Sequence, residues 1–491
     1  MKVLLAGMNV DYGKLCEMKD IVREASNDTG DSAQRLQCFI ESDSLTPETI
    51  SAAYARISRS PLRVDQLRKK AVEDVHKARK SNESIVFDMG HSSVAEHAVF
   101  NIDIIGLSRL ATEFLQEHRV VSFTEKSQRY VKLDEDFIVP AELEDEAGLR
   151  KRFIETVHEL NITYDKLYTR LFDHFSSLHT DLSENDISGM AKEDARYVLP
   201  LATTTQMGMT VNARSAEYII KKLASVPLLE AQFLSRQLYD ILQPVAPSLI
   251  RYTEPSDYDF RKWQNIYDVE LQENTIKTPV TVINHTADGE KSVITALLYR
   301  NRSVTYETLL NSLKKAELPS LLAEEWKGIN FYDSMDRAFE MADVTLELVM
   351  SASCYAQLKR HRMSTIIPGM YDCTLGTVMP DSIQECDMTD VFAEAIEKTE
   401  ELAGDIAFLD GPVSSYALTN AHKRRVIMKA NIREWYHFVR LRSDKHAQWE
   451  IRRLSHAIET ELKRIYPLLT AIMMGKDAFA GAQVQHGKKG K

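Results

Sequence analysis

The sequence predicts a mixed α and β fold built as two tandem copies of one module. Strand-like alternation and helix-like periodicity both occur along its 491 residues. Three landmarks recur in the same order in two halves of similar size, which indicates a duplication. The length alone favours about three domains, within a range of roughly two to four.

Composition narrows the function classes. Hydrophobic residues make up 44% and charged residues 27% of the chain, which excludes wholesale disorder and collagen-like or low-complexity classes. A net charge of −11 argues against nucleic acid as the main partner. No apolar run is long enough for a membrane span or a secretory signal. Five cysteines without a C-x-x-C pair favour a reducing cytoplasm and no disulfide or zinc framework.

The first 80 residues show few strong patterns. Residues 1–10 predict a short buried strand, and a polar, irregular stretch follows up to Ser44. A helix is expected to open at Thr46, as N-cap, because proline occupies the next position. Residues 62–80 predict one charged amphipathic helix.

The next segment carries the clearest periodicities. Residues 98–105 alternate as in a half-buried strand, which Gly106 is expected to break. Apolar residues from Leu107 to His118 then lie on one helical face. Helical patterns resume at 148–180 and 213–242. We expect four parts: an N-terminal domain at 1–250, a linker at 251–289, a C-terminal domain at 290–474 and a flexible basic tail at 475–491.

The repeat rests on three ordered landmarks. A Glu-His-Arg segment ending at Arg119 and an Arg-His-Arg segment ending at Arg362 both follow an amphipathic helix. A glutamate precedes each histidine by 22 residues in the first copy and 21 in the second. Downstream, an Asn-x-Arg segment opens a helix at Asn212 and again at Asn431. The ordered set predicts two diverged copies of one ancestral module.

Four blocks concentrate polar side chains, and each also has a structural interpretation. Residues 90–97 pair Gly-His with Glu-His, but the two histidines are six apart, off one helical face, so no metal site is predicted. Residues 117–130 place arginine, histidine and serine after the C-terminal end of a helix. These side chains could bind a phosphate, or they could form only a solvated, charged helix end. Residues 194–215 contain Asn212, which is also an adequate N-cap. Residues 431–452 gather cations among aromatics, as a site or a charged helix surface does.

Together these blocks resemble the flavin-dependent thymidylate synthase family. The family's Arg-His-Arg, seven residues, Ser, then Arg-Tyr pattern matches residues 117–130, and its Gly-His…Glu-His block matches 90–97. Ala-Arg-Ile-Ser at 55–58 resembles its early Ala-Arg-Val-Ser. The resemblance covers most of 50–245 and, with larger gaps, about 290–470. It implies an α+β fold in each copy, with helices around a small antiparallel sheet.

Each copy departs from the family pattern. The first has Glu117 where the family has its leading arginine, and Leu223 where the family has an arginine after the Asn-x-Arg segment. The first copy also lacks a clear His-Ala-Gln-x-Glu block. The second has Met370 at the serine position, and it has Met335 and Ser415 about where a histidine and an arginine are expected. Neither copy alone carries a full family site.

Family sites lie between subunits of a homotetramer, so the resemblance predicts composite sites and a homodimer that forms a pseudo-tetramer. The favoured composite site sets the first copy's loop against the second copy's helix. The converse pairing lacks the serine. The residues that the resemblance implies as catalytic are His118, Arg119, Ser127 and Arg442. Those implied as substrate-binding are Glu125, Ser127, Gln128, Arg129, Arg196, Gln357, Arg360 and Arg442.

The resemblance also implies the chemistry. The reaction would be reductive methylation of dUMP to dTMP, with FAD as cofactor and methylenetetrahydrofolate and NADPH as co-substrates. The residues implied to bind the cofactor are Ser58, His91, Ser93, Glu96, His118, Val120, Asn212, Arg214, Arg360, His361, Asn431, Arg433, His437 and His446. Two alternatives stay open: a flavoenzyme that modifies another pyrimidine nucleotide at carbon 5, and an inactive family member that serves as a binding or scaffold protein.

Overall fold

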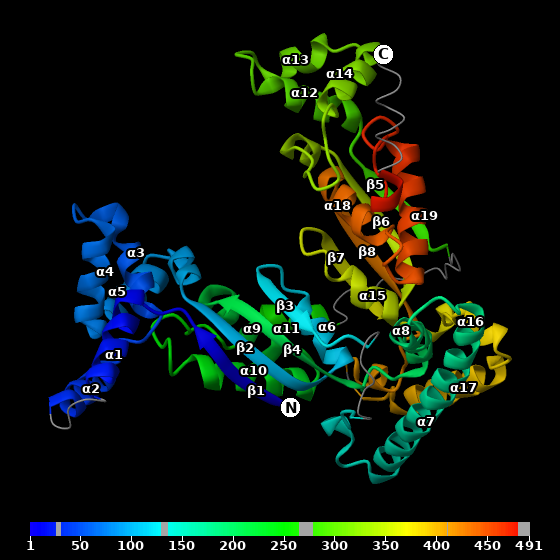
Figure 1. Cartoon of the computed structure of the whole chain (residues 1–491), viewed down its shortest axis with the longest axis horizontal. Helices are drawn as coiled ribbons and strands as arrows, with labels where there is room; N and C mark the ends of the chain where they lie inside the picture. Colours follow the sequence, from blue (N-terminus) through cyan, green and yellow to red (C-terminus); the bar gives the residue numbers. More distant parts are fainter. Residues whose placement is uncertain (26–30, 129–135, 265–277, 410, 480–491) are drawn as a thin grey trace. The chain divides into compact units, whose positions relative to one another are not determined.

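Two four-stranded antiparallel sheets with the same strand order form the framework of the chain (Figure 1). The first runs β1-β2-β4-β3, from β1 (Lys2–Met8), β2 (Val99–Ser108), β3 (Val121–Glu125) and β4 (Thr204–Asn212). The second runs β5-β6-β8-β7, from β5 (Val280–His285), β6 (Asp343–Ser351), β7 (Thr365–Tyr371) and β8 (Lys423–Asn431). The shared order confirms the predicted α+β fold in two tandem copies.

The structure is a computed structural model that describes residues 1–25, 31–128, 136–264, 278–409 and 411–479. It divides into two compact units. Unit 1 comprises 1–161, 200–270 and 401–417, and unit 2 comprises 162–199, 271–400 and 418–491. Each unit therefore holds a segment from the other sequence copy. The four predicted parts of the chain follow the two copies along the sequence, and they stay a prediction.

Strand β2 shows why one prediction was wrong. Its alternate residues Phe100, Ile102 and Ile104 are buried, as the sequence pattern predicts. The strand nevertheless continues through Gly106, which adopts a φ of +75°. The pairing with β4 shifts register between Ile105 and Leu107. Glycine tolerates this left-handed φ, so it forms a bulge inside the strand where the sequence suggested an end.

The N-terminal region is more helical than predicted. The stretch expected to be irregular contains α1 (Tyr12–Ala25) and α2 (Asp31–Glu41). Helix α3 (Glu48–Ala55) has Pro47 as its N-cap, whereas the hydroxyl of Thr46 donates to the carbonyl of Val245 at 3.0 Å. The expected helix at 62–80 is two helices, α4 (Val64–Glu73) and α5 (Val75–Glu83). It breaks at Asp74, whose carboxylate instead accepts from the Lys77 amide and caps α5.

The remaining helices belong to unit 1, to unit 2 or to both (Figure 1). Unit 1 contains α6 (Arg109–Gln116), α9 (Ala213–Ala224), α10 (Leu229–Leu242) and α11 (Asp257–Phe260), so the helix expected at 213–242 is interrupted near Pro227. Unit 2 contains α8 (Glu184–Ala195), α12 (Gly289–Tyr299), α13 (Tyr306–Ser312), α14 (Leu318–Glu325), α15 (Ala352–Leu358), α16 (Asp381–Glu385), α18 (Ile432–Arg442) and α19 (Trp449–Ile465). Helices α7 (Ala147–Leu178) and α17 (Thr389–Ile406) each begin in one unit and end in the other.

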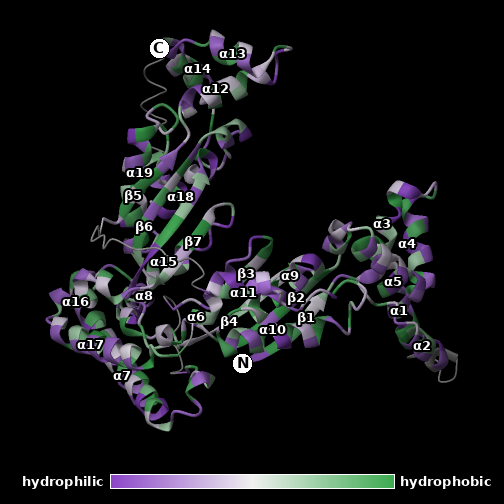
Figure 2. Cartoon of the chain, turned by 180° about the vertical axis from the view of Figure 1, so that it is seen from behind, coloured by the Kyte–Doolittle hydropathy of each residue, from purple (hydrophilic) through white to green (hydrophobic). Residues whose placement is uncertain are grey.

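The core of unit 2 lies between its sheet and helices α18 and α19. Phe339, Trp435 and Phe438 are fully buried there, and the strand residues Leu346 and Leu348 pack into the same cluster. Figure 2 shows hydrophobic residues along the strands of this sheet. Burial of these large side chains fixes the helices, each contributing roughly 1.5–3 kcal/mol.

A glutamate with equivalent hydrogen-bond donors repeats at the start of α10, where it is half-buried, and of α19, where it is buried. In unit 1, the carboxylate of Glu230 accepts from the Ser108 amide at 2.8 Å and from the Tyr416 hydroxyl at 2.6 Å. In unit 2, Glu450 accepts from the Ser351 amide at 3.0 Å and from the Tyr197 hydroxyl at 2.6 Å. Each tyrosine comes from the other sequence copy, so the exchanged segments are held by the same hydrogen bond in both units.

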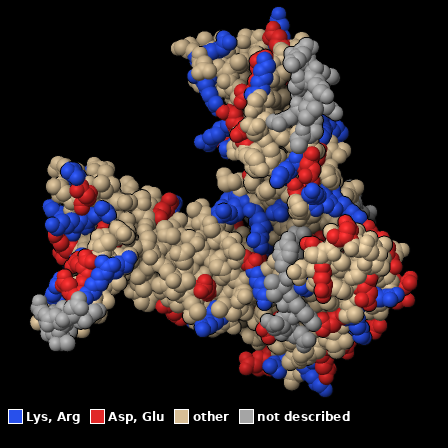
Figure 3. All heavy atoms as spheres, viewed as in Figure 1, with Lys and Arg blue, Asp and Glu red and all other residues tan. Residues whose placement is uncertain are grey.

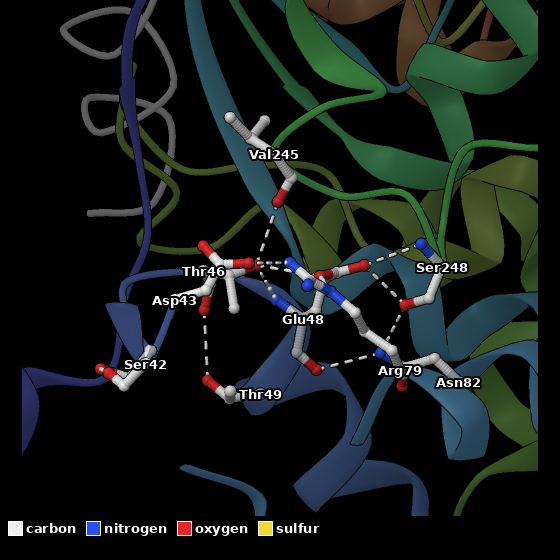
Figure 4. Close-up of polar contacts among 10 residues, drawn as sticks. Ser42, Asp43, Thr46, Glu48, Thr49, Arg79, Asn82, Val245 and Ser248 are labelled. Carbon is white, nitrogen blue, oxygen red and sulfur yellow. Dashed lines mark hydrogen bonds and ion pairs between the residues drawn. The ribbon is translucent and has the colours of Figure 1, made fainter. Parts of the chain in front are cut away.

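A buried carboxylate also joins α3 to the chain after α10 (Figure 4). Glu48 is fully buried, and it accepts from the amide and hydroxyl of Ser248 at 2.8 and 2.7 Å. Arg79 donates to the same carboxylate at 2.5 Å and also pairs with Asp43. The Asn82 amide donates to the Glu48 carbonyl at 3.0 Å. This carboxylate has its acceptors engaged within the protein, so it serves as a structural tether.

The surface is mixed in charge. Figure 3 shows acidic and basic side chains interspersed over α16 and α17. Ion pairs such as Lys398–Glu394 (3.0 Å) and Arg453–Asp381 (2.5 Å) contribute to this pattern. Among the described residues, no helix combines the length and the apolar character that a membrane span requires.

Candidate functional site

Helix α18 places a row of cations in unit 2. It begins at Ile432 because the side chain of Asn431 accepts from the Glu434 amide at 2.9 Å. One face of the helix, including Trp435 and Phe438, is buried in the core. His437 is exposed and Arg442 is half-buried at the opposite end of the helix. The packing of the apolar face therefore fixes where the cations point.

Arg442 is held by two contacts with the end of α15. Its Nε donates to Nε2 of His361 at 3.0 Å, and a terminal nitrogen donates to the carbonyl of Gln357 at 2.9 Å. Nδ1 of His361 lies 3.3 Å from a carboxylate oxygen of Glu434. Since a guanidinium only donates, Nε2 of His361 is the acceptor, and its Nδ1 carries the proton that it donates to Glu434. We call the Glu434–His361–Arg442 chain the relay.

The environment keeps the relay histidine neutral. Burial, Arg442 and His437 lower the pKa of His361 well below its usual range. Burial also raises the pKa of Glu434. A neutral His361 with a fixed tautomer orients the guanidinium of Arg442 without competing with it for charge.

Other predicted residues of unit 2 surround the relay or lie apart from it. Arg360 and His446 are exposed, and the ring of His437 lies 5.7 Å from that of His361, edge to face. Arg433 points away, donating to the carbonyl of Met335 at 2.8 Å and pairing with Glu340 at 3.0 Å. Arg360, next to His361 in the chain, His437 and Arg442 are thus basic side chains around the His361 ring, and two of them are guanidinium groups that suit an anionic ligand. We call the relay, together with Arg360 and His437, the α18 centre.

Arg196 belongs to the first sequence copy but lies in unit 2. It is buried, its Nε donates to the carbonyl of Glu193 at 3.2 Å, and its own carbonyl accepts from Asn420 at 2.9 Å. Its charge acts on Cys354, a buried thiol whose pKa burial raises well above the usual range. A thiol that stays protonated is a poor nucleophile. Cys354 is therefore not an activated cysteine.

Unit 1 contains a second copy of this arrangement with different side chains. Helices α6 and α9 correspond to α15 and α18 by their places beside equivalent strands. His118 corresponds to His361, and it is 8% exposed. Its Nε2 is buried without a hydrogen-bond partner among the described residues. Leu223, itself buried, stands at the position of Arg442, which explains the missing donor. We call this copy the α9 centre.

Electrostatics reinforce the difference between the two centres. Burial, with the cations Lys262 and Lys222 nearby, lowers the pKa of His118 to about 4. The ring of Tyr218 packs edge to face on His118 at 5.5 Å, at the position that His437 occupies in unit 2. Glu117, which stands where Arg360 stands in unit 2, pairs with Lys262 at 3.3 Å. The α9 centre thus has Glu117, Tyr218 and Leu223 at the positions of Arg360, His437 and Arg442 in the α18 centre.

The structure places the other predicted residues of unit 1 in varied settings. Arg214 pairs with Glu96 at 2.5 Å, and Asn212 accepts from the Ser215 amide at 2.8 Å as the cap of α9. Glu125 pairs with Arg109 and accepts from Gln116 at 3.0 Å, so its carboxylate is engaged inside the unit. A guanidinium nitrogen of Arg59 lies 3.3 Å from His91. The residues that are exposed are Ser58, Ser93, Arg119 and Val120; Ser127 is half-buried and Gln128 is buried. Arg129 lies outside the described residues.

The roles predicted for these residues stay predictions, and so does the composite pairing of the 118–129 loop with α18. The relay itself was only partly foreseen. Sequence reasoning named His361 and Arg442 but missed Glu434. The sequence feature that could have identified Glu434 is its position three residues after the Asn431 cap. A side chain there lies on the turn of α18 that faces the end of α15.

Two clusters in the described residues have the composition of a metal site. They are His361, Glu434 and His437, and Cys373, Glu400 and His422. In the first, both ring nitrogens of His361 are used by the relay. In the second, Nδ1 of His422 accepts from the Thr419 amide at 2.9 Å, so its Nε2 carries a proton. Metal binding needs a free imidazole lone pair, which neither buried histidine offers.

Comparisons with known proteins agree with the duplicated architecture. The family model described as "Thymidylate synthase complementing protein" matches residues 41–248 and again 281–468. The flavin-dependent thymidylate synthase of Clostridium tetani is 32% identical over 214 residues, which cover 43% of this chain and 83% of that protein. A UPF0159 protein of Thermoplasma acidophilum is 24% identical over 447 residues, which cover 79% of this chain and 87% of that one.

A solved structure of a flavin-dependent thymidylate synthase is among the matches. The flavin-dependent thymidylate synthase of Helicobacter pylori, complexed with FAD and dUMP, is 19% identical, with a TM-score of 0.30, over 51% of this chain and 100% of its own. The two family matches together span most of the chain, one for each sheet. The chain therefore belongs to the thymidylate synthase complementing family, the flavin-dependent thymidylate synthases, as a tandem form with diverged copies.

Proposed function

We propose that this protein catalyses the flavin-dependent reductive methylation of dUMP to dTMP, with methylenetetrahydrofolate as the one-carbon donor and NADPH as the reductant. Membership of the family supports the reaction class. The observation that carries the proposal is the relay, because it fixes the half-buried guanidinium of Arg442 on the ring of His361 and on the carbonyl of Gln357. We propose the α18 centre as the site.

The donors of the α18 centre fit both anionic ligands of the reaction. A guanidinium binds a phosphate or a pyrimidine carbonyl through two parallel hydrogen bonds, and Arg442 and Arg360 both carry this group. Exposed Arg360 and His437 would hold the flavin edge, where positive charge favours the reduced anionic ring. Bound FAD would supply the hydride and carry the one-carbon unit. The protein supplies orientation and positive charge.

Chemistry without a cysteine nucleophile agrees with the thiols of the chain. All five cysteines are free. Burial raises the pKa of Cys354, the thiol on α15, and that of Cys386. Polarisation of the uracil ring by cations is then the means by which the protein can activate carbon 5.

Two further parts of the proposal concern assembly and location. We propose a homodimer, whose four modules would match the tetramer that the family resemblance implies; light scattering would measure its mass. We also propose a cytoplasmic location, which free thiols at all five cysteines support.

Tritium release from carbon-5-labelled dUMP tests the reaction. The full-length chain should release tritium when FAD, NADPH and methylenetetrahydrofolate are all present, and omission of FAD should abolish the release. Arg442→Ala should lower the rate at least about a hundredfold, because a charged bidentate contact is worth roughly 3 kcal/mol. The control Arg453→Ala removes an arginine whose pair with Asp381 lies on the surface.

The outcomes separate the alternatives. Flavin binding without tritium release or dTMP would favour modification of another pyrimidine nucleotide at carbon 5. Purified protein that stays colourless after reconstitution with FAD would contradict the proposal and favour a binding or scaffold role.

A further inference from the structure

The segment that joins the two sequence copies packs onto the α9 centre. Its first residues are fixed by Glu217 of α9, whose carboxylate accepts from the Arg251 and Tyr252 amides at 2.8 and 2.6 Å. Helix α11 and the short 3-10 helix after it, Arg261–Trp263, then follow. Every residue of this segment from 251 to 264 belongs to unit 1.

Charge fixes the segment to α9. Asp259, 5% exposed, accepts from Lys222 at 2.6 Å and pairs with Lys221 at 3.2 Å. The Lys222 hydrogen bond is the main cause that holds the pKa of Asp259 well below its usual range. The Ser256 amide donates to the same carboxylate at 2.9 Å and closes the capping box of α11. Asp259 therefore neutralises cations that α9 would otherwise offer to an anionic ligand.

The other end of the segment reaches the end of α6. Lys262 pairs with Glu117 at 3.3 Å, and the ring of Trp263 packs edge to face on Phe114 at 5.8 Å. The indole nitrogen of Trp263 is buried without a hydrogen-bond partner among the described residues, so this ring is held by packing.

The residues in contact with the segment are those by which the two centres differ. Phe114 and Glu117 stand at the positions of Gln357 and Arg360, because α6 and α15 follow equivalent caps, Ser108 and Ser351. Both replacements suit the segment, because the apolar ring of Phe114 packs on Trp263 and the carboxylate of Glu117 pairs with Lys262. Glu117, already paired with Lys262, also supplies none of the positive charge that Arg360 could offer a nucleotide phosphate.

From these contacts, we propose that segment 256–264 is the resident occupant of the α9 centre, so that this centre binds neither flavin nor nucleotide. Each chain then carries one working centre, on α18. The part of this inference that names flavin and nucleotide rests on the proposed function. The part that places the segment on the α9 centre rests only on contacts within unit 1.

The first test counts flavin on the full-length chain. After reconstitution with FAD and gel filtration, we expect one FAD per chain. His437→Ala should weaken FAD binding at least tenfold, whereas Tyr218→Ala, the matched change in the α9 centre, should alter it less than twofold. Two FAD per chain would overturn the proposal, and so would flavin loss in Tyr218→Ala comparable to that in His437→Ala.

The second test does not depend on flavin. Trypsin should cleave the wild-type chain after Arg261 and Lys262 at least tenfold more slowly than it cleaves the double variant Asp259→Ala, Trp263→Ala, with fragments identified by mass spectrometry. Tyr258→Ala, at a residue that is 74% exposed, should behave as wild type. Equal cleavage of wild type and double variant would overturn the docking. A chain that binds no flavin would refute the proposed function, and the cleavage rates would still decide whether the segment is docked.

Discussion

The buried histidine of the α9 centre makes the stability of the protein depend on pH. His118 is 8% exposed, and its pKa is lowered from 6.5 to about 4. Because the native state holds the neutral ring, the unfolded chain binds more protons between pH 6.5 and 4. The contribution of neutral His118 to the unfolding free energy is therefore fully present above about pH 6.5, and it is lost as the pH falls towards 4.

The magnitude follows from the two pKa values. The difference between the pKa of His118 in the unfolded and the native state corresponds to about 3 kcal/mol of unfolding free energy, all of which is lost below pH 4. About 2 kcal/mol of this is lost between pH 7 and pH 5. His118→Gln removes the titrating group and should lower the pH dependence by that amount. Lys262→Gln should reduce the pH dependence in part, because the charge of Lys262 is the largest cause of the lowered pKa of His118 after burial.

Urea unfolding at pH 7 and pH 5 measures the effect. The change in unfolding free energy between the two pH values is compared for wild type, His118→Gln and Lys262→Gln. His361 remains in all three proteins, so its own contribution cancels in the comparison. An equal loss of stability in wild type and His118→Gln would show that the His118 ring is protonated or solvated in the native state, contrary to the reasoning.

Three other predictions concern the buried polar groups. Glu434→Ala leaves Nδ1 of His361 without its acceptor, so tritium release should fall about tenfold in kcat/KM, and Glu434→Gln should restore most of it. Tyr416→Phe removes a 2.6 Å hydrogen bond to Glu230 and should cost about 1–3 kcal/mol in urea unfolding, whereas Tyr239→Phe, on the surface, should be neutral. Glu48→Ala should cost about 3 kcal/mol or more because it leaves buried donors unpaired, whereas Asp43→Ala, an exposed partner of Arg79, should cost less than about 1 kcal/mol.

The sequence by itself determined the modular architecture. Local patterns carried it: the alternation at 98–105 gave β2, the apolar face before His118 gave α6, and Asn212 and Asn431 each cap a helix as predicted. These features depend on neighbours within a turn or two along the chain, so periodicity and caps are enough to place them. The ordered landmarks likewise revealed the duplication, which the two identical strand orders confirm.

Only the tertiary structure decided which polar groups meet. The relay joins Glu434, His361 and Arg442 across 81 residues of sequence, and no local pattern distinguishes such a contact from a solvated charge. The same holds for Tyr197 and Tyr416, which lie in the unit opposite to their own sequence copy. The Gly106 bulge likewise shows only in the strand pairing, because a glycine in the sequence suits both the end of a strand and a bulge within it. Long-range burial selects the partner of each polar side chain, because an unpaired buried group is costly wherever along the chain its partner lies.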